Sequence, residues 1–129
     1  MPRYALLIYD EESAWEDMSP EDRAARMEAY YDFTEDVMKA GVAGASDALE
    51  SVSTARTVRV RDGDRMVTDG PFAETKEQLG GFYIVECETV EQALDWAARI
   101  PSAQTGSIEV RPIVDFPPRQ AAGSEGENA

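Results

Sequence analysis

Acidic and phenolic side chains are the acid–base groups to consider first, because the chain contains no histidine. That absence excludes Ser-His-Asp triads, Cys-His couples and histidine-ligated zinc. Asp69 begins an Asp-Gly-Pro-Phe turn, and a carboxylate held at the mouth of a cleft there would serve as a general acid or base. Tyr30 could donate a hydrogen bond to a bound carbonyl group. We therefore take Asp69 and Tyr30 as candidate catalytic residues.

A second set of side chains suits the recognition of a small molecule. Arg111 follows Glu109 by two positions, so both point to one side of a strand, where the guanidinium group would match an anionic ligand. Lys76, close in sequence to Asp69, could position a negative substrate. Trp15 interrupts an acidic segment, and we expect its indole to fold over a hydrophobic edge as a lid. The candidate ligand-binding residues are Trp15, Gly70, Pro71, Phe72, Lys76, Tyr83, Glu109 and Arg111.

Each candidate also has a structural interpretation. Asp69 suits capping its own turn, and Gly70 and Pro71 suit shaping it. Tyr30 and Tyr83 have spacings that are typical of core aromatic residues. The charged pair on the last strand would equally form an ion pair between subunits, and the charged residues after the turn would form a solvated loop.

Composition narrows the possible partners. The chain has 129 residues with 26 acidic and 12 basic groups, a net charge of −14, so nucleic acid and anionic membranes would repel it. We expect no cofactor and no metal, because no spacing of ligands is typical of a metal site. Cys87 is the single cysteine and cannot form an internal disulfide, which favours a cytoplasmic location. No stretch is long and apolar enough for a membrane span.

Hydrophobic periodicity and turn residues predict the elements in chain order. Ser19-Pro20 begins a long helix that Gly41 ends, and Asp62-Gly63 closes a hairpin. Strands are expected at residues 4–9, 42–50, 57–61, 65–68, 82–87 and 107–114, helices at 19–41 and 89–100, and an acidic loop at 10–22. The apolar stripe of the first helix is expected to run through Ala24, Met27, Tyr31, Thr34 and Met38, widened by Tyr30, Phe33 and Val37.

This order is a βαββαβ pattern with an extra β-hairpin, which predicts an α+β fold with an antiparallel sheet and both helices on one face. Two of the strands are apolar on both sides, so the bare face of the sheet would expose a large hydrophobic patch. A second copy of the same face would cover it. We therefore predict a homodimer with its sheets packed face to face.

The segment from Asp69 to Phe82, with its Asp-Gly-Pro-Phe start and Gly80-Gly81 end, resembles the YCII-related family and its DGPF branch. The similarity extends over residues 4–9, Trp15, Ser19-Pro20-Glu21 and 106–112. It implies a ferredoxin-like dimeric α+β barrel over residues 1–116. The content of Pro, Gly, Ser and charged residues predicts a disordered acidic tail at 117–129. In better-studied members a histidine on the first helix pairs with an aspartate. Tyr30 stands at that position here, which leaves Asp69 as the plausible carboxylate.

Three functions are compatible with this sequence. The first is an enzyme that uses Asp69 as acid or base, with Tyr30 and Arg111 orienting a small substrate in a cleft between sheet faces. The second is a non-catalytic ligand-binding or regulatory dimer with the same cleft. The third is a structural module that engages a protein partner through its acidic surface.

Overall fold

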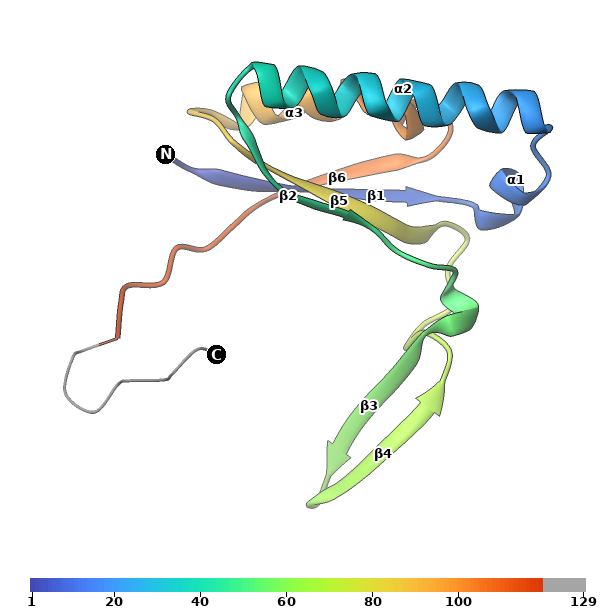
Figure 1. Cartoon of the computed structure of the whole chain (residues 1–129). Helices are drawn as coiled ribbons and strands as arrows, with labels where there is room; N and C mark the ends of the chain where they lie inside the picture. Colours follow the sequence, from blue (N-terminus) through green and yellow to red (C-terminus); the bar gives the residue numbers. More distant parts are fainter. Residues whose placement is uncertain (120–129) are drawn as a thin grey trace.

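The computed structural model describes residues 1–119, which form a four-stranded sheet with two long helices on one face and a separate hairpin (Figure 1). The elements are β1 (Arg3–Asp10), α1 (Glu12–Glu16), α2 (Pro20–Lys39), β2 (Ala43–Ala48), β3 (Arg56–Arg61), β4 (Asp64–Asp69), β5 (Gln78–Glu86), α3 (Val90–Arg99) and β6 (Ser107–Pro112), with short 3-10 turns at Val52–Thr54 and Pro101–Gln104. The predicted α+β class, antiparallel sheet and extra hairpin are confirmed.

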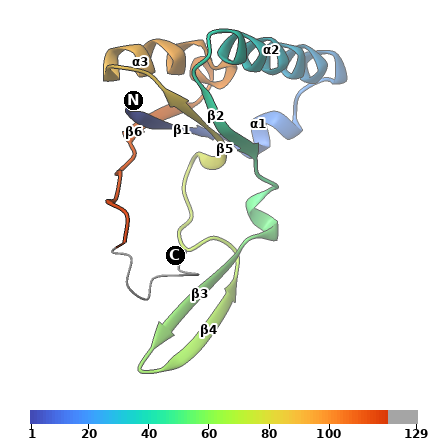
Figure 2. The ribbon, with the colours of Figure 1, turned by 60° about the vertical axis from the view of Figure 1, so that its left-hand side comes forward.

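The sheet has the strand order β2-β5-β1-β6, and all of its pairings are antiparallel. Alternate residues of β1 are buried, namely Tyr4, Leu6 and Ile8, and these face α2 and α3. The opposite face has no helix over it in either view of the ribbon (Figures 1 and 2). Within one chain the sheet is therefore open, not a closed barrel, because its edge strands β2 and β6 do not pair with each other.

The hairpin of β3 and β4 forms a sheet of its own on the side away from the helices (Figures 1 and 2). Its turn is the predicted Asp62-Gly63 pair, and both residues have positive φ angles, of 52° and 81°. That geometry matches the right-handed twist of a tight hairpin.

The long helix begins where the sequence predicts, because the Ser19 hydroxyl accepts the Asp22 N–H at 3.0 Å. The predicted stripe is wrong in part, since Phe33 and Val37 are its buried residues, whereas Tyr31 and Met38 are exposed. Phe33 and Val37, which were expected only to widen the apolar stripe, are therefore at its centre. Several faces of this helix carry apolar residues at a spacing of 3.6, and packing against β5 determines which face is buried.

Two predicted irregular segments, residues 10–22 and the C-terminal tail, differ in outcome. The predicted loop at 10–22 contains the short helix α1, because residues 12–16 satisfy one helical turn of hydrogen bonds. The predicted disordered tail lies largely outside the described residues, which end at 119.

Candidate functional site

A cleft of about 770 Å³ lies on the helix side of the sheet, between α2 and strands β1, β5 and β2, with α1 at one end. Its apolar lining includes four aromatic side chains, of Trp15, Tyr30, Tyr31 and Tyr83, together with Ile8, Met27 and Leu49. The volume is that of a typical site for a small organic molecule. The cleft forms within one chain, on the opposite side of the sheet from the cleft between sheet faces that the sequence predicts.

Tyr30 reaches the cleft from α2 and is tied to the other side of the fold. Its hydroxyl oxygen lies 2.6 Å from the Ser102 hydroxyl, in the 3-10 turn that follows α3. Burial raises the pKa of Tyr30, and this effect outweighs the lowering by the hydrogen bond to Ser102. The phenol therefore stays protonated and acts as a hydrogen-bond donor or acceptor, not as a base.

Tyr83 enters the same cleft from β5. Its hydroxyl oxygen lies 2.7 Å from the Thr34 hydroxyl of α2, and its ring meets Phe33 edge-on with centroids 4.9 Å apart. Two hydroxyl pairs thus join α2 to the surrounding elements along the floor of the cleft. Each pair offers polar atoms that a bound molecule could share.

Helix α1 is fixed at the cleft by Glu12. Its carboxylate accepts the Ser51 hydroxyl at 2.9 Å and the Val52 N–H at 3.0 Å, and its own N–H donates to the Gln78 side chain at 3.0 Å. The helix is thereby tied to the segments that flank the hairpin.

Trp15 of α1 lines the cleft and is 38% exposed. Arg23 of α2 lies over its ring at 5.7 Å and donates to the backbone carbonyls of Trp15, Glu16 and Met18. The guanidinium group therefore holds α1 against the start of α2.

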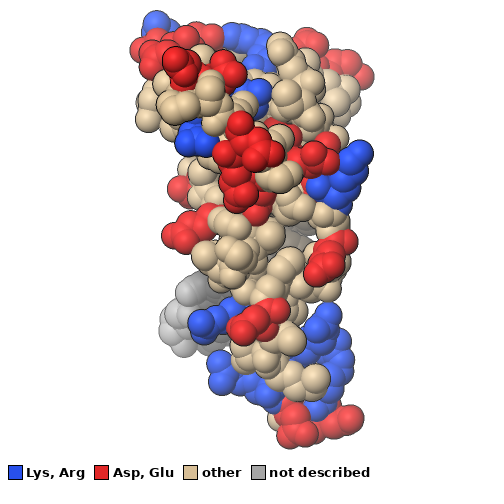
Figure 3. Space-filling view, turned by 90° about the vertical axis from the view of Figure 1, so that its right-hand side faces the viewer, with Lys and Arg blue, Asp and Glu red and all other residues tan. Residues whose placement is uncertain are grey.

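The polar lining of the cleft is predominantly acidic. Asp10 accepts the Thr105 hydroxyl at 2.8 Å and lies 3.9 Å from the Arg26 guanidinium. Among the described residues, the carboxylates of Glu11, Glu16 and Asp47 have no hydrogen bond or ion pair. Acidic side chains also gather in the middle of the face in Figure 3, above the hairpin. Five carboxylates against one arginine give the cleft a negative potential: Asp10, Glu11, Glu12, Glu16 and Asp47 against Arg26.

The Asp-Gly-Pro-Phe turn lies away from this cleft, at the base of the hairpin. The Asp69 side chain is 99% exposed and lies 3.9 Å from Arg56. Gly70 has a φ of 93°, donates to the Ala55 carbonyl at 2.7 Å and accepts the Thr57 hydroxyl, so it closes the hairpin. The exposed Pro71 and Phe72 follow, and Phe72 is 79% exposed.

The charged candidates also lie outside the cleft. Lys76 is exposed in the loop before β5. Glu109 and Arg111 lie opposite Leu7 and Ala5 on the open face of the sheet, and the Arg111 Nε donates to Glu109 at 3.1 Å. That hydrogen bond raises the pKa of Arg111. The structure thus brings together Trp15, Tyr30 and Tyr83 and leaves the other candidates elsewhere.

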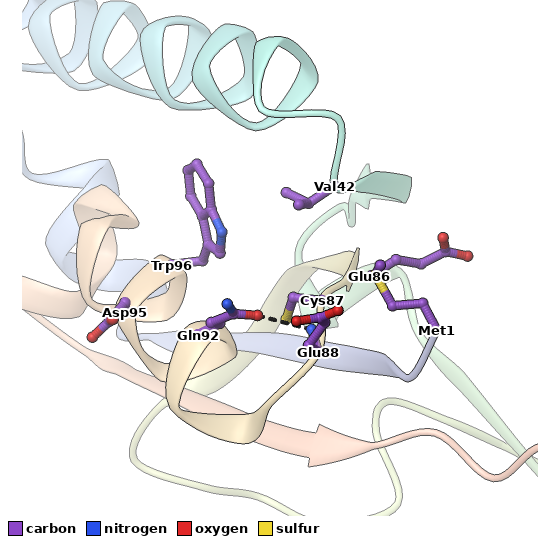
Figure 4. Close-up of a pocket in the computed structure, with 8 residues that line it drawn as sticks. All are labelled: Met1, Val42, Glu86, Cys87, Glu88, Gln92, Asp95 and Trp96. Atoms are coloured by element: carbon purple, nitrogen blue, oxygen red, sulfur yellow. Dashed lines mark hydrogen bonds between the residues drawn. The ribbon is translucent and has the colours of Figure 1, made fainter.

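A second pocket of about 330 Å³ lies at the other end of the sheet, beside Cys87, Gln92 and Trp96 (Figure 4). The Cys87 side chain is buried, and its thiol donates to the Thr89 carbonyl at 3.6 Å. Burial raises the pKa of this thiol, so the thiolate is disfavoured. Cys87 therefore acts as a small hydrophobic residue.

The sequence did not predict Ser102 and Ser51, the two serines that hydrogen-bond to Tyr30 and Glu12 at the cleft. Ser102 lies 72 positions from Tyr30, and Ser51 lies 39 positions from Glu12. Single serines in short polar segments carry no signal for such partners. Within residues 1–119, no cluster of side chains has the composition of a metal site, and no helix has the length and hydrophobicity of a membrane span.

The YCII-related domain matches residues 2–117, so the chain belongs to the YCII-related family. An uncharacterised protein from Rhizobium meliloti (strain 1021) is 39% identical over 117 residues, which cover 89% of this chain and 94% of the relative. The family expected from the sequence is therefore confirmed, and its DGPF branch stays a prediction.

Proposed function

We propose that the protein binds a small organic molecule in the cleft beneath α2. The observation that carries this proposal is the aromatic wall of the cleft, formed by residues from α1, α2 and β5 at a volume suited to one ligand. Trp15 covers one end, and the hydroxyl groups of Tyr30 and Tyr83 supply polar anchors. An aromatic or otherwise flat apolar ligand fits this lining.

The charge of the lining favours a cationic ligand over an anionic one. The three unpaired carboxylates of Glu11, Glu16 and Asp47 would attract an amine and repel a carboxylate. Lys76 and Arg111, which would hold an anion, lie elsewhere. We therefore infer that the ligand has an apolar body and a protonated amine.

Binding without catalysis is the function that the geometry favours. The exposed Asp69, the proposed acid or base, does not line the cleft. The acid–base role of Asp69 stays a separate prediction, and Asp69→Asn tests whether this carboxylate contributes to ligand binding. The variant should bind ligands as the natural chain does, within about twofold. A loss of tenfold or more in ligand affinity would show that Asp69 contributes to the ligand site.

Thermal shift and calorimetry with matched compounds test the cleft directly. Phenethylamine and 3-phenylpropionate have similar apolar bodies and opposite charges, so the amine should bind and the acid should not. A ligand at about 100 times its dissociation constant adds about 2.7 kcal/mol to the free energy of unfolding.

Two methionines of α2 provide a matched pair of variants. Met27 lines the cleft, whereas Met38 is 65% exposed outside it. Met27→Ala should weaken amine binding about tenfold, because it removes about 1.4 kcal/mol of apolar contact, and Met38→Ala should not. Equal effects of the two variants, or stronger binding of the acid, would contradict the proposal.

We also propose that the chain forms a homodimer through the open face of the sheet, as in the ferredoxin-like dimeric barrel that the family resemblance implies. The half-buried Leu7, Phe82 and Ile84 share this face with Ala5 and Tyr9, by their register in β1 and β5. Such a patch supports burial against a second copy. Sedimentation should give twice the mass of the 14.2 kDa chain, and a particle of 14.2 kDa at 100 µM would contradict the dimer.

A further inference from the structure

The hairpin of β3 and β4 has an apolar side that nothing in the described part of the chain covers. The register places Val58 opposite Val67 and Val60 opposite Arg65, so the three valines share one face with Arg65. Their exposed fractions are 56% for Val58, 60% for Val60 and 48% for Val67. The opposite face is the less exposed one at Thr57 and Arg59, which are half-buried.

The exposure of the two faces is the reverse of what is expected for a solvated hairpin. Alternation predicts that valines pack inward and arginines face water. A two-stranded hairpin without further packing is also only marginally stable. The valine face is therefore suited to a surface that a single chain does not supply.

The charge of the hairpin indicates the partner. Residues 56–69 contain four arginines and three aspartates, which gives the hairpin a net charge of +1. The rest of the chain has a net charge of −15, and the whole chain has −14. Figure 3 shows a group of basic side chains on the hairpin at the bottom of the molecule, with acidic side chains at its tip and further basic ones on the upper part. An acidic surface attracts such a ribbon, and a second copy of this chain has one.

The position of the hairpin agrees with that partner. It projects on the side of the sheet away from α2 and α3 (Figures 1 and 2). When two open sheet faces meet about a two-fold axis, a partner chain lies on this same side.

We propose that the hairpin is an interchain arm, whose face of Val58, Val60 and Val67 packs against the acidic body of a second copy. The arm rests on the homodimer proposed above and adds a contact outside the sheet faces. Each protomer would give one arm and receive one, as two-fold symmetry requires.

Neighbouring residues on the two faces of the ribbon provide the test. Val67→Asp places a charge on the arm face, and Met66→Asp places the same charge on the other face at nearly equal exposure, 48% against 50%. Sedimentation equilibrium from 0.1 to 100 µM should show the dissociation constant of the dimer raised about 100-fold by Val67→Asp. Met66→Asp should change it by less than threefold, and both variants should keep the circular dichroism spectrum of the natural chain.

The outcomes separate the arm from the other proposals. A natural chain that dimerises, with equal constants for the two variants, would overturn the arm and leave the sheet-face dimer standing. A natural chain that is monomeric at 100 µM would overturn both. Ligand binding in the cleft is tested independently by Met27→Ala, because that residue lies on α2 within one chain.

Discussion

The hydroxyl pair of Tyr30 and Ser102 joins α2 to the turn after α3, and Ser102 is buried at 5% exposure. Tyr30→Phe removes the only side-chain partner that the described residues give this serine. We expect the free energy of unfolding at pH 7 to fall by about 1 kcal/mol, the usual cost of a lost buried hydrogen bond. Urea unfolding measures it. Thr34→Val, which removes the other hydroxyl pair of the cleft, is the comparison variant.

The same residue predicts a pH dependence. Burial raises the pKa of Tyr30 in the folded chain above its unfolded value of about 10, so the unfolded chain releases this proton first. Its contribution to stability is full below pH 10 and is lost as the pH rises through the folded value. Between pH 9 and pH 11, stability should therefore fall more steeply for the natural chain than for Tyr30→Phe. Parallel curves would contradict the assignment.

At the scale of single residues, the sequence predicted the cleft only in part. Trp15, Tyr30 and Tyr83 lie in it because aromatic side chains beside a sheet are driven to the nearest apolar surface. Asp69 does not lie in the cleft, because it ends the hairpin, and the position of the hairpin relative to the sheet cannot be predicted from periodicity. Hydrophobic periodicity says which side of an element is buried, but it does not say which distant loop lies opposite.

At the scale of elements, features set by neighbouring residues were predictable. The Ser19 cap and the Asp62-Gly63 turn are confirmed, by a hydrogen bond and by positive φ angles respectively. The helix α1 was missed because its stability comes from Glu12 and Arg23, whose partners are other segments of the chain. Short helices depend on such tertiary contacts more than on their own propensity.

The start of β6 depends on close approach of two backbones, which gives a prediction at this scale. A Cβ atom on Gly106 would clash with the Tyr9 carbonyl oxygen and lie 3.0 Å from the Asp10 Cα. Backbone atoms in a paired strand cannot move aside cheaply, so Gly106→Ala should lower the free energy of unfolding by about 2–3 kcal/mol. Gly80→Ala, where nothing lies within 4 Å, should change it by less than about 0.5 kcal/mol. Urea unfolding of both variants decides the matter, and equal losses would contradict the close approach.

At the scale of the whole molecule, the layered architecture followed from the order of elements. The two strands expected to be apolar on both sides are β1 and β5, and the strand order places them side by side in the middle of the sheet. The sequence did not predict from one chain what covers the open face of the sheet and the hairpin, because within residues 1–119 no helix or strand lies over either surface. The dimer and its arms stay proposals.

The net charge of −14 predicts how stability responds to salt. With 26 acidic groups on a chain of this size, repulsion between carboxylates opposes the compact state, and salt screens it. Raising NaCl from 20 to 300 mM at pH 7.5 should therefore raise the melting temperature of the natural chain by about 2–6 °C. Tetramethylammonium chloride at equal ionic strength should give the same rise, because screening does not depend on the identity of the cation. A falling melting temperature would mean that ion pairs such as Arg99 with Asp36, at 2.6 Å, outweigh the repulsion.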